Sequence, residues 1–173
     1  MQIYIQKISS SIESSIRTKQ LILEDQAMIT SIEEVVKIIV NAFQNGNTVY
    51  WCDNEGTASD AKHLAAELSS RFYFDRHSLP SEALHVNGSY ITDVANDYVY
   101  ENIYSRYISS CAKKGDVLVG ISVSGNSENI VNAFKTAKEK EMKIVSFLGN
   151  EGRVMKQFAD YNLIVLSKDT PRT

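Results

Sequence analysis

The feature that most constrains the fold is an alternation, from residue 46 onward, of short apolar runs with longer stretches of helical periodicity. The runs that read as strands lie at 48–52, 81–86, 116–121, 143–148 and 162–166. Helical patterns lie between them at 57–72 and 127–140, with a short helix around 153–158. Nearly continuous apolar strands separated by helices are typical of a parallel sheet covered on both faces. The sequence therefore predicts an α/β fold with a doubly wound, five-stranded parallel sheet.

Two further helices are predicted ahead of this alternation. Apolar residues recur at helical spacing over residues 3–24 and again over 29–43. Gly46 follows the second pattern and is a suitable helix stop. There is no linker-like or low-complexity stretch and no internal repeat. We therefore expect one domain over 1–173, with N-terminal helices for oligomer packing in 1–45 and an α/β core that binds the substrate in 46–173.

Composition narrows the possible partners. The chain has 173 residues and a formal net charge of −3, with no cluster of positive residues, so nucleic acid is not an expected partner. No apolar run approaches the roughly 18 residues of a membrane span, and the polar N-terminus does not read as a signal peptide. The two cysteines lack metal-like spacing, and we interpret Cys52 as a core residue in a protein of the reducing cytoplasm.

The loop after the third predicted strand carries the clearest chemical signal. Ser122, Ser124 and Ser127 surround Gly125 where that strand gives way to a helix. Free N–H groups and the helix dipole favour an anion at such a junction, and hydroxyls add donors. The plainer alternative, Ser127 as an N-cap, explains one serine of the three. We therefore favour a phosphate site, although the loop alone names no reaction.

Two other stretches contain polar residues whose role the spacing does not decide. His63 and Glu67 are four residues apart, so they share one helix face. They either bind a metal and exchange protons or form an ordinary solvated pair. Asn96 and Asp97 either bind sugar hydroxyls or cap the helix that follows them.

Taken together, these stretches resemble the SIS sugar-isomerase family, and within it the phosphoheptose isomerases, which have a flavodoxin-like sheet. The resemblance runs over nearly the whole chain. Its motifs are 54–67 with Ser-Arg-Phe at 70–72, Ala-Asn-Asp-Tyr at 95–98, Gly-Ile-Ser-Val-Ser-Gly-Asn-Ser at 120–127 and Asp-Thr-Pro-Arg at 169–172. Such enzymes convert sedoheptulose 7-phosphate to D-glycero-D-manno-heptose 7-phosphate, on the way to the ADP- or GDP-heptose of lipopolysaccharide or capsule.

The resemblance implies a role for each matching residue. Glu67 is the base that moves a proton between C1 and C2, and His63 and Glu67 are two ligands of one zinc ion per subunit. It further implies a cytoplasmic homotetramer whose active sites are shared between subunits. Substrate-binding residues are expected at Asn54, Glu55, Gly56, Thr57, Glu67, Asn96, Asp97, Ser122, Val123, Ser124 and Ser127.

The sequence departs from the family in two places. Asp53 and Glu55 stand where the family usually has glycine, which places two acids near the expected phosphate. If these positions need a positive φ, a side chain there costs roughly 1 kcal/mol or more. The family also continues after Arg172 with a Gln-Glu-x-x-His helix that supplies the general acid and the remaining zinc ligands. The sequence stops at Thr173, and we expect the natural chain to be longer.

Two other functions remain as alternatives. An SIS domain that has lost catalysis would still bind a sugar phosphate as a sensor, and the acidic loop favours this alternative. A nucleotide-binding or signalling domain is the third possibility. It is disfavoured because neither GxxxxGK[ST] nor GxGxxG occurs in the sequence.

Overall fold

The computed structural model describes residues 2–165, 167 and 169, and it contains the predicted parallel sheet. The strands follow the order β2-β1-β3-β4-β5, and every neighbouring pair is parallel. Each predicted apolar run overlaps a strand: β1 (Val49–Cys52), β2 (Ser81–Ala83), β3 (Val117–Ser122), β4 (Lys143–Leu148) and β5 (Tyr161–Ile164). The doubly wound fold is thus confirmed, and Leu166, at the end of the last predicted strand, lies outside the described residues.

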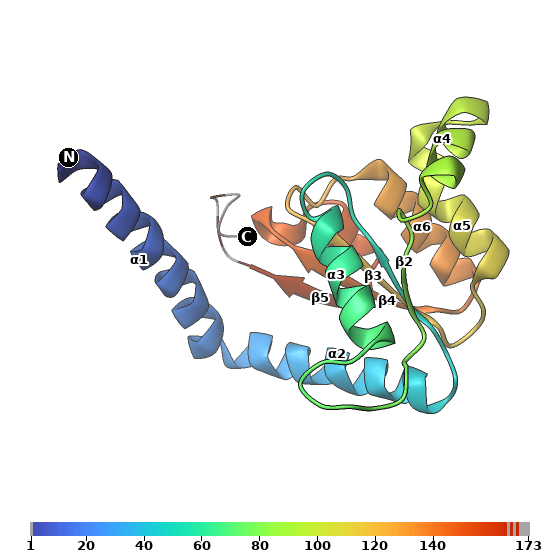
Figure 1. Cartoon of the computed structure of the whole chain (residues 1–173), viewed down its shortest axis with the longest axis horizontal. Coiled ribbons are helices and arrows are strands. Elements are labelled where there is room, and N and C mark those ends of the chain that lie inside the picture. Colours follow the sequence, from blue (N-terminus) through green and yellow to red (C-terminus); the bar gives the residue numbers. More distant parts are fainter. Residues whose placement is uncertain (1, 166, 168, 170–173) are drawn as a thin grey trace.

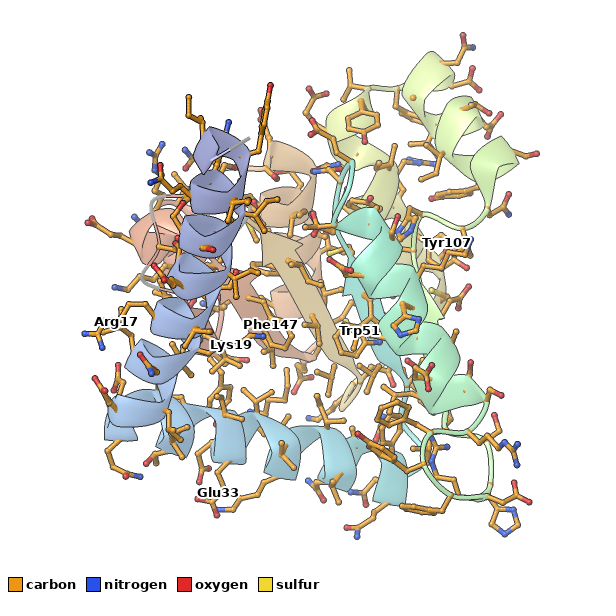
Figure 2. The ribbon with its side chains drawn as sticks, turned by 60° about the vertical axis from the view of Figure 1, so that its left-hand side comes forward. Arg17, Lys19, Glu33, Trp51, Tyr107 and Phe147 are labelled. Atoms are coloured by element: carbon orange, nitrogen blue, oxygen red, sulfur yellow. The ribbon has the colours of Figure 1, made fainter. Side chains whose placement is uncertain are left out.

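Alternate residues of the strands build a core on each face of the sheet. One core joins Val49, Trp51, Val117, Val119 and Val145 to the helices α2 (Gln26–Gln44) and α3 (Ala58–Ser69). The other contains Tyr50, Cys52, Leu118 and Ile144 and is covered by α4 (Gly88–Asp97), α5 (Ile103–Cys111) and α6 (Glu128–Glu139). Figure 2 shows Trp51 and Phe147 on the α2–α3 side, where their rings meet edge to face with centroids 6.4 Å apart.

Cys52 is the interior residue that the sequence predicted. It is fully buried, and burial raises the pKa of its thiol well above the ordinary value. A thiol held in its neutral form is a poor nucleophile, so a packing role is consistent with its surroundings.

The two predicted N-terminal helices are present, but they differ in what they contact. Helix α2 packs on the sheet, and its N-cap Asp25 accepts hydrogen bonds from the N–H groups of Ala27 and Met28. Helix α1 (Gln2–Glu24) instead projects away from the body of the molecule (Figure 1). Large apolar side chains along it stay exposed: Ile3, Tyr4, Ile5, Ile8, Ile12, Ile16, Leu21 and Leu23. No helix in the described part of the chain is long and apolar enough to cross a membrane.

The predicted end of the helix after β1 is wrong. Helix α3 ends at Ser69 rather than near residue 72. The guanidinium of Arg76 donates to the carbonyl oxygens of Glu67 and Leu68, at 2.9 and 2.8 Å. These carbonyls belong to the last helical turn and have no partner within a helix that stops there. A cation from the loop that follows α3 therefore caps its end, and the 3.6-residue pattern that continues to Phe72 does not reveal this contact.

The strand order places the functional loops. The chain passes from β1 outward to β2 and then crosses back to β3, so the carboxyl ends of β1 and β3 lie next to each other. Open α/β sheets bind ligands at such a reversal of direction. The loop after β1 and the loop after β3 therefore meet at one edge of the sheet.

Candidate active site

The three serines of the loop after β3 converge on one another. The Ser122 hydroxyl lies 3.1 Å from the Ser127 hydroxyl and 3.4 Å from that of Ser124. Two backbone groups hold the same cluster, because the N–H of Gly125 donates to Ser122 Oγ and the N–H of Asn126 donates to Ser124 Oγ. The loop thus gathers hydroxyl groups directly ahead of the first turn of α6.

Gly125 allows the loop to close in this way. Its φ is +66°, a conformation that glycine adopts without strain, and a Cβ there would lie 2.7 Å from the carbonyl oxygen of Gly152. The carbonyl of Gly125 also accepts a hydrogen bond from Met155 N–H at 2.9 Å. The segment between β4 and β5 therefore fixes the shape of the serine loop.

The alternative role of Ser127, in which its side chain caps the following helix, is wrong. Ser127 occupies the N-cap position of α6, yet its side chain makes no capping hydrogen bond. Its hydroxyl is directed to Ser122 instead. The Ser127 side chain therefore does not occupy the N–H groups at the start of α6, and such a helix N-terminus favours an anion.

The loop after β1 is tied to the start of α6 by a pair of amides. Asn54 and Asn129 exchange hydrogen bonds of 3.0 and 2.8 Å, and the Tyr100 hydroxyl donates to Asn54 Oδ1 at 3.1 Å. The sequence predicted Asn54 as a sugar ligand but gave no role to Asn129 or Tyr100. Their contribution depends on the sheet order, which brings residues 75 positions apart into contact.

Both loops line a single cavity of about 560 Å³. It contains eight of the predicted substrate-binding residues, together with Asp53 and Tyr100: Asn54, Glu55, Gly56, Thr57, Ser122, Val123, Ser124 and Ser127. The cavity therefore brings most of the predicted binding set together.

The two acids of this cavity differ in conformation and in exposure. Glu55 is exposed and has φ +53°, so the condition under which a side chain costs stability is met at this position. Asp53 does not have a positive φ and is 2% exposed. Burial raises the pKa of Asp53 to about 6, although the nearby Thr57 hydroxyl and Asn54 N–H partly oppose the shift.

His63 and Glu67 lie apart from this cavity. They share one face of α3 as predicted, with His63 Nε2 3.7 Å from Glu67 Oε1. Their side chains are 72% and 31% exposed, and neither lines the cavity of the serine loop. Thr57 directly precedes α3, and at 1.5 Å per residue Glu67 lies about 15 Å further along the helix axis. Within one chain, the predicted base and the predicted phosphate site therefore do not lie together.

His63 and Glu67 offer two adjacent donor atoms to a metal ion. An imidazole and a carboxylate suit zinc chemically. Within the part of the chain that the structure describes, no group of three or more His, Cys, Asp and Glu side chains is placed to hold a metal ion. His63 and Glu67 therefore fit as part of a ligand set that other groups would have to complete.

Asn96 and Asp97 lie at the C-terminal end of α4 and are exposed. Asn96 donates to Asp97 Oδ1 at 2.9 Å, and neither residue lines the cavity. The capping alternative is wrong, because Asn102 stands at the N-cap of α5. As with His63 and Glu67, a contact between these residues and a substrate in the cavity is not made within one chain. The remaining family motif at 169–172 has its last three residues outside the described ones.

Comparison with known proteins identifies what the chain resembles. The sequence model of the family described as SIS domain matches residues 5–149. A phosphoheptose isomerase from Clostridium acetobutylicum is 48% identical over 165 residues, which cover 95% of this chain and 84% of that protein. Phosphoheptose isomerase structures from Neisseria gonorrhoeae and Francisella tularensis superpose with TM-scores of 0.90 and 0.91, at 29% and 31% identity. Each superposition covers 98% of this chain and 89% of the other.

Proposed function

The chain belongs to the SIS-domain family and, within it, to the phosphoheptose isomerases, and from this we infer that it interconverts sedoheptulose 7-phosphate and D-glycero-D-manno-heptose 7-phosphate in heptose biosynthesis. The observation that carries the inference is the match of 48% identity over 95% of the chain. The cluster of three serine hydroxyls at the start of α6 gives that match a chemical basis, because it supplies donors for the phosphate.

The reaction needs a base beside C1 and C2 of the sugar. The base takes a proton from C1 of the ketose while the carbonyl oxygen on C2 gains one, and an enediol results. The oxygen on C1 then loses its proton while C2 receives one, which gives the aldose. We assign the base to Glu67. The serine loop holds the phosphate at the other end of the sugar, and this fixes the position of C1 and C2.

Self-association would bring the two halves of the site together. Glu67 lies far along α3 from the serine loop of its own chain, so we propose that it serves the loop of another subunit. The exposed apolar row of α1 supports this assembly, because Ile5, Ile8, Ile12 and Ile16 keep 50–60% of their surface in water. Figure 2 shows Arg17 of α1 and Glu33 of α2 pointing away from the sheet. We propose a homotetramer, which light scattering would test, and a persistent monomer would contradict a shared site.

Zinc is a second proposal at the same helix. His63 and Glu67 would hold the ion together with further ligands, and the bound ion would supply Lewis acidity toward a sugar oxygen. Metal analysis of protein purified without chelator tests this proposal. A His63→Ala variant should lose the metal, whereas His77→Ala should keep it. We further propose a cytoplasmic location, with which the two free cysteines accord, and a product that feeds lipopolysaccharide or capsule heptose.

Turnover of sedoheptulose 7-phosphate by the full natural polypeptide tests the function. We expect formation of the heptose 7-phosphate, with Glu67→Gln at least about a hundredfold slower. Glu67→Gln should bind the sugar phosphate nearly as well as the parent, since the phosphate donors remain. Binding by the parent protein without any turnover would contradict the enzyme and favour the second candidate, a sugar-phosphate-binding module. The two acids in the loop after β1 are the observation that favours that module.

A further inference from the structure

The cavity of the serine loop contains a buried carboxyl group that the isomerisation does not require. Asp53 follows β1 directly and is 2% exposed. Its Oδ1 accepts a hydrogen bond from Asn54 N–H at 2.6 Å, whereas its Oδ2 is buried and has no hydrogen-bond partner among the described residues. The Tyr104 hydroxyl donates to the carbonyl oxygen of Asp53 and thereby fixes the backbone there. The side chain is therefore held in place beside the loop that would bind phosphate.

In the described part of the chain, the charges that act on this carboxyl group are negative. None of the ion pairs among the described residues includes Asp53. The charged groups that act on it are Glu55 on its own loop and Asp60 on α3, and both repel a negative charge. The first turn of α6, which directly follows the serine loop, carries another acid, Glu128.

The other titratable groups around Asp53 are uncharged at neutral pH. They are the buried thiol of Cys52 and the hydroxyl of Tyr104. Burial raises the pKa of both the Cys52 thiol and the Tyr104 hydroxyl, so neither group ionises near pH 7. Asp53, whose pKa is raised to about 6 by burial, therefore changes its charge close to neutral pH.

We propose that Asp53 makes the site bind phosphate esters together with a proton, so that the bound ester and the Asp53 carboxyl group share one proton taken from solvent. The proposal rests on the proposed binding of phosphate by the serine loop. Its physical reason is that a phosphate dianion and a carboxylate in one cavity repel each other, and a proton on either group removes most of the repulsion. Relatives with glycine at this position lack the carboxyl group and would bind without this uptake.

The sign of the pH dependence follows from the direction of the shift. With its pKa near 6, Asp53 is largely neutral in the free protein below that pH, and binding is strongest there. A bound anion raises the pKa of Asp53 further, because it repels the carboxylate. Affinity should therefore fall as the pH rises above about 6, and level off once the pH exceeds the pKa in the complex. In Asp53→Asn the side chain stays neutral, so the affinity of this variant should not fall in the same way.

Calorimetric titration with two probes tests the proposal. Sulfate does not change its charge between pH 5.5 and 8, so any pH dependence of its binding belongs to the protein, whereas sedoheptulose 7-phosphate tests the ester itself. We compare the parent with Asp53→Asn over this range. The two proteins should bind sulfate alike at pH 5.5, and Asp53→Asn should bind it on the order of tenfold more tightly at pH 8. Titrations in two buffers of different ionisation enthalpy measure the protons taken up on binding. Near pH 7 the parent should take up more protons than Asp53→Asn.

Two further variants serve as controls. Glu55→Gln removes an exposed acid from the same loop, so it should raise affinity by a similar factor at every pH. Asp53→Gly tests the same proton linkage without the asparagine amide, and it should match Asp53→Asn in its pH profile. Thermal melts establish that each variant is folded.

The outcomes separate the two levels of the proposal. A ratio of affinities between parent and Asp53→Asn that stays constant from pH 5.5 to 8 would overturn the proton linkage while leaving phosphate binding intact. Failure of both the parent and Asp53→Asn to bind either probe at any pH would overturn the phosphate site, and the linkage with it.

Discussion

Replacing Ser127 with alanine separates two roles that one serine ahead of a helix can have. If the hydroxyl capped α6, its loss would cost about 0.5–2 kcal/mol of folding free energy. The structure directs it to Ser122 Oγ at 3.1 Å and shows no capping bond. Ser122 keeps its contact with Gly125 N–H, so no buried group loses its last partner. We therefore expect a change in the free energy of unfolding below about 0.5 kcal/mol.

Binding should respond much more strongly to the same replacement. A hydrogen bond to a charged group contributes about 1.5–3 kcal/mol, so the dissociation constant for sedoheptulose 7-phosphate should rise roughly tenfold to a hundredfold. Calorimetry measures the binding and urea denaturation measures the stability. Asn87→Ala is the matched control, because Asn87 does cap a helix, accepting from Tyr90 N–H at 3.1 Å. That variant should lose about 1 kcal/mol of stability and keep its affinity. A Ser127→Ala protein that loses stability but binds normally would refute the reasoning.

Two other substitutions test the local geometry by urea denaturation. Glu55→Gly should stabilise the fold by about 1 kcal/mol, because Glu55 has φ +53°, whereas Glu55→Ala should not stabilise it; equal effects of the two would assign the gain to charge instead. Gly120→Ala should destabilise it by about 1–3 kcal/mol, because the new Cβ would lie 2.5 Å from the Phe134 ring in a buried contact. Gly88→Ala is its control, because nothing lies within 4 Å of a Cβ at Gly88. If Gly120→Ala loses no more stability than Gly88→Ala, α6 has room to shift.

The sequence predicted the fold well because its main signals are local. Each apolar run is long enough to fill a buried strand, and Gly46, with φ +68°, follows α2 as the stop signal predicted. The end of α3 could not be predicted in the same way. It depends on the Arg76 guanidinium, and that contact forms only after the chain between α3 and β2 has turned back.

The candidate site was predictable in its residues but not in all of their contacts. The serine loop is contiguous, so its hydroxyls could be assigned to one place from the sequence alone. The Asn54–Asn129 pair joins two loops, and nothing in either segment indicates the other. The burial of Asp53 likewise arises from packing around the end of β1, because its position after the strand is equally compatible with exposure. Sequence patterns report the direction of side chains within one element and do not report contacts between elements.

The most direct test of the central claim is isomerisation of sedoheptulose 7-phosphate in D₂O, followed by NMR. An enediol route in which Glu67 exchanges its proton with solvent puts deuterium at C2 of the heptose product. We expect that label from the parent, and at least about a hundredfold less labelled product per unit time from Glu67→Gln under saturating substrate. Absence of turnover by the parent would contradict the assignment as an isomerase. Labelled product formed by Glu67→Gln at the parent rate would show that another group moves the proton.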